Sequence, residues 1–279
     1  MNELLEKQIV LSNGSKIASL GLGVFKIANE DTANIVFNGI KSGYRVIDTA
    51  QIYGNELGVG QGVKDACSQL SISREELFIT SKVWNNHLGY QETIAAFEKT
   101  LTDLGLDYLD LYLLHWPGRQ DFMPAWRALE SLYKAGKVKA IGVSNFNRHH
   151  LELLLAQAAV KPVINQIELH PKLNQTELVT FCMQHDIVVQ AWSPLMQGEL
   201  LQQELISKLA RDYKKSPAQI ILKWHLQQDH LLVVKSNKVE RMEENVALEF
   251  DITPKDMELI TKLNENIRIG PDPDHFDFK

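Results

Sequence analysis

The chain has 279 residues, of which 44% are hydrophobic and 23% charged, as in an ordinary soluble globular protein. Its net charge of -6 argues against a nucleic-acid partner, because phosphate binding needs a surplus of Lys and Arg. No apolar run is long enough to span a bilayer, and the start, MNELLEKQIVL, lacks the features of a signal peptide. Cys67 and Cys182 lie in helix-like segments and indicate buried thiols. We therefore expect a cytoplasmic protein without a membrane partner.

The first element in chain order is a predicted β-hairpin. Asn13-Gly14 stands between two short alternating runs, which is a strong hairpin signal. Short β-rich apolar runs then alternate with longer amphipathic stretches, a pattern typical of βαβ units and a parallel sheet. The predicted strands are Ser19–Gly23, Arg45–Asp48, Leu77–Val83, Tyr108–His115, Lys139–Ser144, Val163–Glu168, Ile187–Trp192 and Leu231–Lys235.

Helices are predicted between these strands, for example over Asp31–Lys41, Gln91–Leu104 and Pro124–Ala135. Gly105 and Gly136 stand just past helix ends, where glycine commonly terminates a helix. Ser216-Pro217-Ala218-Gln219 has the residues of a capping box with proline at the first helical position. A further helix is expected near Thr253–Asn264, followed by an irregular tail rich in Asp and Pro.

Eight βα units in an uninterrupted chain predict an α/β protein, a (β/α)8 TIM barrel formed by residues 1–279 as a single domain. The hairpin and the last helix with its tail are additions to it. A doubly wound open sheet is the alternative. That fold would be supported by a Rossmann fingerprint, but after Gly21 and Gly23 the place of the third glycine is taken by Lys26.

Polar and aromatic residues gather at the carboxyl ends of the predicted strands. Catalytic groups of such barrels project from these ends. Any one of them alone is expected to be an ordinary solvated or structural residue, so the prediction of a site depends on their coincidence. They are Asp48 with Tyr53 shortly after it, Lys82, Trp84, His115, Trp116, Ser144, Asn145, Gln166, His170, Trp192, Ser193, Lys235, Ser236 and Asn237.

The motifs at these strand ends resemble those of the aldo-keto reductases. DTAQIYGNE, TSKVW, LHWP, GVSNF, NQIELHP, WSPL and VVKSNKVERMEEN occur in the order and spacing of that family, over essentially the whole chain. The sequence looks most similar to bacterial members with a short tail, the glyoxal/methylglyoxal reductases and 2,5-diketo-D-gluconate reductases. The resemblance implies a monomeric enzyme that reduces small aldehydes and ketones with NADPH.

The family's catalytic tetrad corresponds to Asp48, Tyr53, Lys82 and His115, with Tyr53 as proton donor. A free phenol titrates near pH ~10, and a neighbouring ammonium is expected to lower its pKa. Lys82 supplies that charge, Asp48 keeps the lysine charged, and His115 donates a hydrogen bond to the carbonyl oxygen. No metal is expected. The adjacent pair His149-His150 is predicted to point to different faces of a helix.

By the same resemblance, Ser144, Asn145 and Gln166 hold the nicotinamide amide, and Trp192 stacks on its ring where the family usually has Tyr. The loop Ser193–Gly198 surrounds the pyrophosphate, and Lys235 with Arg241 pairs with a 2′-phosphate. Val233-Val234 replaces the Ile-Pro found in many members. The cofactor residues are Gly23, Val24, Ser144, Asn145, Gln166, Trp192, Ser193, Pro194, Leu195, Gln197, Gly198, Lys235, Ser236, Asn237, Arg241, Glu244 and Asn245, and the pocket residues are Phe25, Trp84 and Trp116.

Three alternatives stay open from the sequence. The first is that the substrate of such a reductase is a keto sugar, 2,5-diketo-D-gluconate. A second hypothesis is a cofactor-sensing regulatory subunit with little turnover, as in relatives that serve potassium channels. A third is a lyase-type barrel in which Lys82 forms a Schiff base with the substrate.

Overall fold

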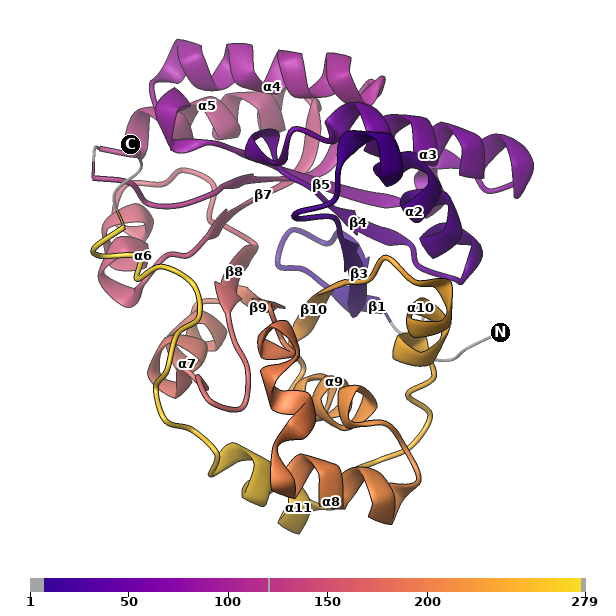
Figure 1. The fold of residues 1–279 in the computed structure, drawn as a ribbon. Coiled ribbons are helices and arrows are strands. Elements are labelled where there is room, and N and C mark those ends of the chain that lie inside the picture. The colour runs from indigo at the N-terminus through magenta and orange to yellow at the C-terminus, as the bar shows by residue number, and fades with distance from the viewer. Residues whose placement is uncertain (1–7, 120, 277–279) are drawn as a thin grey trace.

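The computed structural model describes residues 8–119 and 121–276. Its centre is a closed barrel of parallel strands in the order β10-β3-β4-β5-β6-β7-β8-β9 (Figure 1). This confirms the predicted (β/α)8 barrel, and each predicted strand agrees with the observed one to within a residue at either end. The barrel strands are β3 (Leu20–Gly23), β4 (Val46–Asp48), β5 (Phe78–Val83), β6 (Leu109–Leu114), β7 (Val138–Ser144), β8 (Ile164–Glu168), β9 (Val188–Trp192) and β10 (Leu231–Lys235).

The predicted hairpin is also present, as β1 (Gln8–Val10) paired antiparallel with β2 (Lys16–Ala18). Gly14 in its turn has a φ of 85°, which glycine adopts without strain. Ile17 of the hairpin is buried in one cluster with the first residues of several barrel strands, among them Val46, Phe78 and Leu231. The hairpin therefore closes the amino end of the barrel and leaves the carboxyl ends of the strands for the site.

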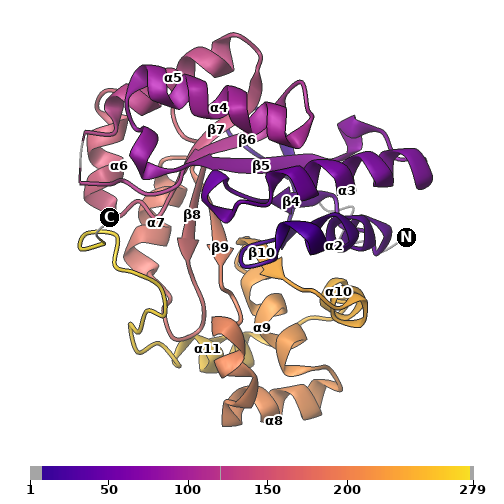
Figure 2. The same ribbon diagram turned by 45° about the horizontal axis from the view of Figure 1, so that its top comes forward.

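Helices surround the barrel on its outer side (Figures 1 and 2). The capping box at Ser216 is confirmed, because its hydroxyl accepts from the Gln219 amide at 3.2 Å and the Gln219 side chain accepts from the Ser216 amide at 2.9 Å. The last helix is shorter than expected and has Thr253 as its N-cap. The helices are α2 (Asn29–Lys41), α3 (Glu56–Gln69), α4 (Tyr90–Leu104), α5 (Met123–Lys134), α6 (Arg148–Leu155), α7 (Thr176–Gln184), α8 (Glu204–Tyr213), α9 (Pro217–Leu226), α10 (Val239–Val246) and α11 (Pro254–Thr261).

Helix α3 contains Gly58, Gly60 and Gly62, although glycine is a poor helix former. Each of them lies against a neighbouring backbone. A Cβ atom at Gly60 would overlap the Leu104 carbonyl at the end of α4, and one at Gly58 or Gly62 would overlap a carbonyl of α2. Close packing between helices therefore explains these glycines. It also fixes the position of α3, which begins at Glu56, between α2 and α4.

Two expectations from composition are only partly settled. Cys182 is buried but Cys67 is half-buried, so the prediction of two buried thiols is wrong for Cys67, whose position on α3 leaves it at the edge of the core.

No helix within residues 8–119 and 121–276 is long and apolar enough to cross a membrane. Residues 1–7, where we expect no signal peptide, lie outside the described residues, and the single-domain assignment of 1–279 stays a prediction.

The contact of Gly60 with Leu104 gives a test of this packing. Gly60→Ala is expected to destabilise the protein by about 1–3 kcal/mol, because the added methyl group forces α3 away from α4. In an exposed helix the same change would stabilise. The free energy of unfolding in urea measures the effect, with Gln61→Ala, an exposed substitution on the same helix, as control. A stabilised Gly60→Ala variant would contradict the close approach of the two helices.

Candidate active site

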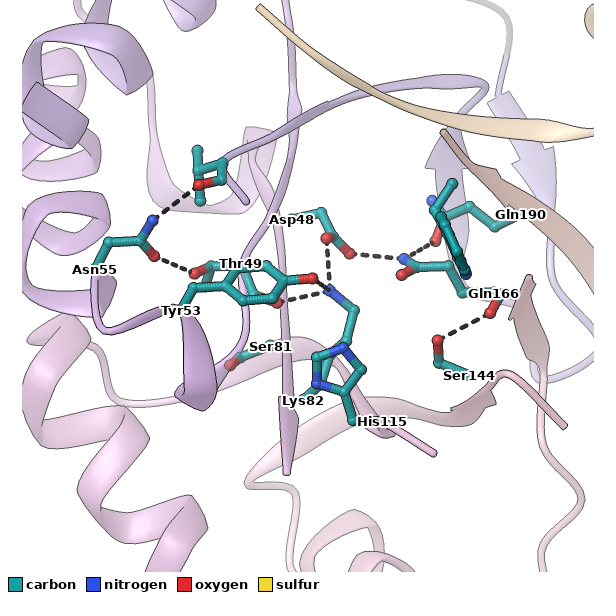
Figure 3. Close-up of polar contacts among 12 residues, drawn as sticks. Asp48, Thr49, Tyr53, Asn55, Ser81, Lys82, His115, Ser144, Gln166 and Gln190 are labelled. Atoms are coloured by element: carbon teal, nitrogen blue, oxygen red, sulfur yellow. Dashed lines mark hydrogen bonds and ion pairs between the residues drawn. The ribbon is translucent and has the colours of Figure 1, made fainter. Parts of the chain in front are cut away.

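Four predicted site residues meet at the carboxyl ends of β4, β5 and β6 (Figure 3). The Lys82 ammonium donates to Asp48 Oδ1 at 2.6 Å and to Tyr53 Oη at 3.4 Å. The ring of His115 lies edge-on to that of Tyr53, with 5.7 Å between the ring centroids. Lys82 is the centre of the group, since it contacts both the carboxylate and the phenol. The predicted tetrad is thus a physical cluster.

Tyr53 is held in place by a short 3-10 turn, η1 (Gln51–Tyr53), and by Asn55 just after it. Asn55 is buried and donates to the carbonyls of Val24 at 2.9 Å and Ile27 at 3.1 Å, while its side-chain oxygen accepts from the Thr49 hydroxyl at 2.8 Å. The Thr49 carbonyl in turn accepts from Lys82 at 2.9 Å. Asn55 therefore ties the tyrosine turn to the barrel. We did not single it out from the sequence, although it lies in the motif DTAQIYGNE.

Burial and charge set the protonation of the cluster. Burial alone would lower the pKa of Lys82, but Asp48 and Tyr53 together raise it above its ordinary value, so this lysine is charged. Burial raises the pKa of Tyr53, and the opposing effect of the Lys82 charge is smaller. The expected net lowering of the Tyr53 pKa is therefore wrong for this structure. Burial and the Lys82 charge hold the pKa of His115 well below its ordinary value, so its imidazole is neutral at pH 7.

Gln166 on β8 joins the cluster from the far side of the barrel (Figure 3). Its amide nitrogen donates to Asp48 Oδ2 at 2.7 Å and to Gln190 Oε1 at 2.8 Å. A carboxylate paired with an ammonium only accepts hydrogen bonds, so the NH2 group of Gln166 must face Asp48. This leaves Oε1 of Gln166 as the atom of that side chain that can accept a further hydrogen bond. Gln190 was missed from sequence because it lies inside an apolar strand run rather than at its end.

Residues at the ends of β7, β8 and β9 are joined by hydrogen bonds. Asn145 donates to the His115 carbonyl at 2.9 Å and accepts from Trp192 Nε1 at 2.8 Å. The Ser144 hydroxyl donates to the Gln166 carbonyl at 2.8 Å. The residues expected to surround a nicotinamide are therefore adjacent, and Asn145 and Trp192 are directly bonded.

Aromatic side chains surround Tyr53 and His115. The ring centroid of Phe25, a residue 51% exposed, lies 4.9 Å from that of Tyr53, and Trp84 lies 5.2 Å from His115. Trp116 is buried and packs against Phe276 of the C-terminal segment at 4.9 Å. The three predicted pocket residues thus flank the cluster, and the tail contributes a fourth ring.

The remaining predicted cofactor residues lie around the ends of β3, β9 and β10. The loop after β9 turns sharply, with positive φ at Ser193, Met196, Gln197 and Gly198. Lys235 is exposed and donates to the Lys26 carbonyl at 3.3 Å. The others divide by burial: Gly23, Val24, Pro194, Ser236 and Asn245 are buried, Leu195 and Glu244 are half-buried, and Asn237 and Arg241 are exposed.

His149 and His150 do not diverge as expected. Both lie in the first turn of α6, and their Nε2 atoms are 3.3 Å and 3.6 Å from Asp274 Oδ1. In the described part of the chain these residues form one group of potential metal ligands. His150 Nδ1 accepts from the Asn147 amide at 3.1 Å, which places its proton on Nε2 and leaves that nitrogen unsuited to a metal. That no metal is bound stays a prediction.

The barrel and the tyrosine–lysine–aspartate–histidine cluster define the class of a barrel oxidoreductase. The model of the aldo/keto reductase family matches residues 18–265, and this chain belongs to that family. The chain is similar to the glyoxal reductase of Bacillus subtilis, with 51% identity over 98% of this chain and 99% of the relative. It is also similar to the methylglyoxal reductase DkgA of Salmonella typhimurium, with 43% identity over 96% and 97%. These findings confirm the resemblance predicted from the strand-end motifs.

A solved structure agrees over the same extent. The Bombyx mori aldo-keto reductase in complex with NADP superposes with a TM-score of 0.91, at 32% identity, and the match covers 96% of each chain. The fold of this chain is therefore similar to that of an aldo-keto reductase whose crystal structure contains NADP.

The buried pair at the centre of the site can be tested by stability. Asp48→Asn is expected to cost about 3–5 kcal/mol, since the ammonium of Lys82, whose side chain is 0% exposed, would keep its charge without an ionised partner. Unfolding in urea measures the cost. The double variant Asp48→Asn/Lys82→Met removes both charges and should regain part of it. A single variant as stable as wild type would contradict a buried ion pair.

Proposed function

We propose that this protein reduces small aldehydes and ketones, of the glyoxal and methylglyoxal type, to alcohols with NADPH. The main support for this proposal is that the Lys82 ammonium donates both to Asp48 and to Tyr53. Membership of the aldo/keto reductase family and the similarity to a glyoxal and a methylglyoxal reductase support the same activity. When bound, NADPH supplies the hydride that adds to the carbonyl carbon.

The residues present suit such a cofactor. Both N–H groups of the Gln166 amide donate, one to Asp48 and one to Gln190, so its oxygen remains to accept a hydrogen bond from a carboxamide NH2. Trp192 offers an aromatic face beside Asn145. The loop Ser193–Gly198 turns sharply at the end of β9, with positive φ at Ser193, Met196, Gln197 and Gly198, and is the segment that we assign to the pyrophosphate. Exposed Lys235 and Arg241 suit a 2′-phosphate.

Tyr53 is the proton donor in this proposal. Its raised pKa keeps the phenol protonated at neutral pH, which is the state a donor needs. As the proton passes to the carbonyl oxygen, the Lys82 ammonium at 3.4 Å stabilises the phenolate that forms. Neutral His115 has one N–H to orient the carbonyl oxygen. Reduction should therefore be retained through neutral pH and decline only at alkaline pH, as Tyr53 loses its proton.

The other hypotheses fit the geometry less well. A Schiff base needs an accessible neutral amine, whereas Lys82 is 0% exposed and its pKa is raised. A regulatory subunit needs no complete proton donor, yet Tyr53, Lys82, Asp48 and His115 are assembled here. We further propose a monomer in the cytosol, where reduced thiols such as Cys67 and Cys182 are stable.

Tyr53→Phe tests the proposed donor. NADPH consumption with methylglyoxal or 4-nitrobenzaldehyde is expected to fall by about 10²–10⁴-fold, the usual contribution of a positioned acid, while NADPH still binds. Tyr90→Phe is the matched control, because its exposed hydroxyl donates to the Ser131 hydroxyl, which is not part of the cluster. Full activity of Tyr53→Phe would rule out this tyrosine as the acid.

Arg241→Ala tests the cofactor preference. The variant is expected to raise the KM for NADPH roughly tenfold or more, the value of a hydrogen bond to a charged group, and to leave the KM for NADH unchanged. Side-by-side kinetics with the two cofactors give the answer, with the exposed Lys255→Ala on α11 as control. An equal effect on NADPH and NADH would show that Arg241 does not recognise the extra phosphate.

A further inference from the structure

Glu168, the last residue of β8, is a buried carboxylate that the proposed reaction does not use. It is 0% exposed and lies two residues after Gln166, on the same side of the strand. A buried carboxylate is costly unless several donors satisfy it. Its donors come from the C-terminal strap, which we define as residues 268–276. The strap runs past α7 towards α6 (Figures 1 and 2).

The Glu168 carboxylate binds the backbone of the strap. Oε1 of Glu168 accepts from the Ile269 amide at 2.7 Å, and Oε2 accepts from the Gly270 amide at 3.1 Å. His170 Nε2 lies 3.1 Å from Oε1. Because the two backbone amides meet different oxygens, a glutamine in this place would turn an NH2 donor towards one of them and lose that hydrogen bond.

Neighbouring groups strengthen the same attachment. The Gln175 side chain donates to the Glu168 carbonyl and accepts from Arg268 at 3.0 Å. Three consecutive strap residues are thereby tied to the end of β8. The strap is held where it begins by polar contacts, and Phe276 packs on Trp116 where it ends.

Gly270 brings the strap into contact with Trp192. A Cβ atom at Gly270 would overlap Cη2 of the Trp192 ring and lie 3.0 Å from Glu168 Oε2. Its φ is not among the positive values, so the close approach and not the backbone conformation requires glycine. On the five-membered ring of the same indole, Nε1 donates to Asn145 at 2.8 Å. Trp192 is therefore held at its nitrogen by Asn145 and contacted at its six-membered ring by Gly270.

We infer that Glu168 is a positioning residue for the cofactor: by holding Ile269 and Gly270 it keeps the strap against Trp192 and so fixes the ring expected to stack on the nicotinamide. This inference rests on the proposed function. It adds that the strap, as well as the strand ends, determines how well the enzyme binds NADPH.

Glu168→Gln tests both parts of the inference. Without cofactor, trypsin should cleave after Arg268 at least about tenfold faster than in wild type, because the released strap opens locally. By calorimetry, NADPH should bind about tenfold more weakly, a change of about 1.4 kcal/mol. In a Trp192→Ala background the substitution should add no further loss of NADPH affinity. Glu265→Gln, the same change at an exposed site ion-paired with Lys172, is the control and should alter neither measurement.

Gly270→Ala is the second variant. It keeps Glu168 intact but pushes on the Trp192 ring, and should also weaken NADPH binding, which covers the case of a Glu168→Gln variant that does not fold. Unchanged tryptic cleavage in Glu168→Gln would overturn the attachment. Faster cleavage with unchanged NADPH affinity would overturn the positioning of Trp192. Failure of the proposed function is distinct, because wild type itself would then reduce no carbonyl with NADPH, whatever the two variants do.

Discussion

The site depends on the ion pair between Lys82 and Asp48, which is buried at the mouth of the barrel. Because the lysine is shielded from water, its charge persists only beside the carboxylate, and among the described residues Lys82 is the one cation paired with Asp48. One ammonium then serves two neighbours: it is held by Asp48 and directed at Tyr53. The second oxygen of Asp48 orients Gln166, so the proposed proton donor and the proposed cofactor residues share a single carboxylate.

The barrel makes this sharing possible. Asp48 and Gln166 are separated by 118 positions in sequence, yet parallel strands in a closed barrel bring their carboxyl ends to one face. The hairpin closes the opposite end, and the strap crosses beside the site. Asp48, Lys82 and Gln166 are therefore held on strands of the barrel, whereas Phe25, Trp84 and the strap belong to segments outside the strands.

Electrostatics at Tyr53 illustrate the limit of local reasoning. Sequence placed an ammonium near the phenol and correctly assigned the direction of its effect. It did not weigh that effect against burial, which is larger and raises the pKa of Tyr53 in the folded protein. The residues that sequence missed have the same origin: Asn55, Gln190 and Glu168 are important through the distant backbone or side chains they contact, and nothing in their own neighbourhood marks those contacts.

The sequence by itself determined the alternation of strands and helices, the strand ends to within a residue, the hairpin, the capping box at Ser216, and the residues at the strand ends. These follow from hydrophobic period and local backbone chemistry, which need only near neighbours. Only the tertiary structure explains the glycine at position 60 of α3 and the contact of Gly270 with Trp192. It alone sets the orientation of the Gln166 amide and the partial burial of Cys67. Those features depend on distances between segments far apart in the chain and on how completely water is excluded between them.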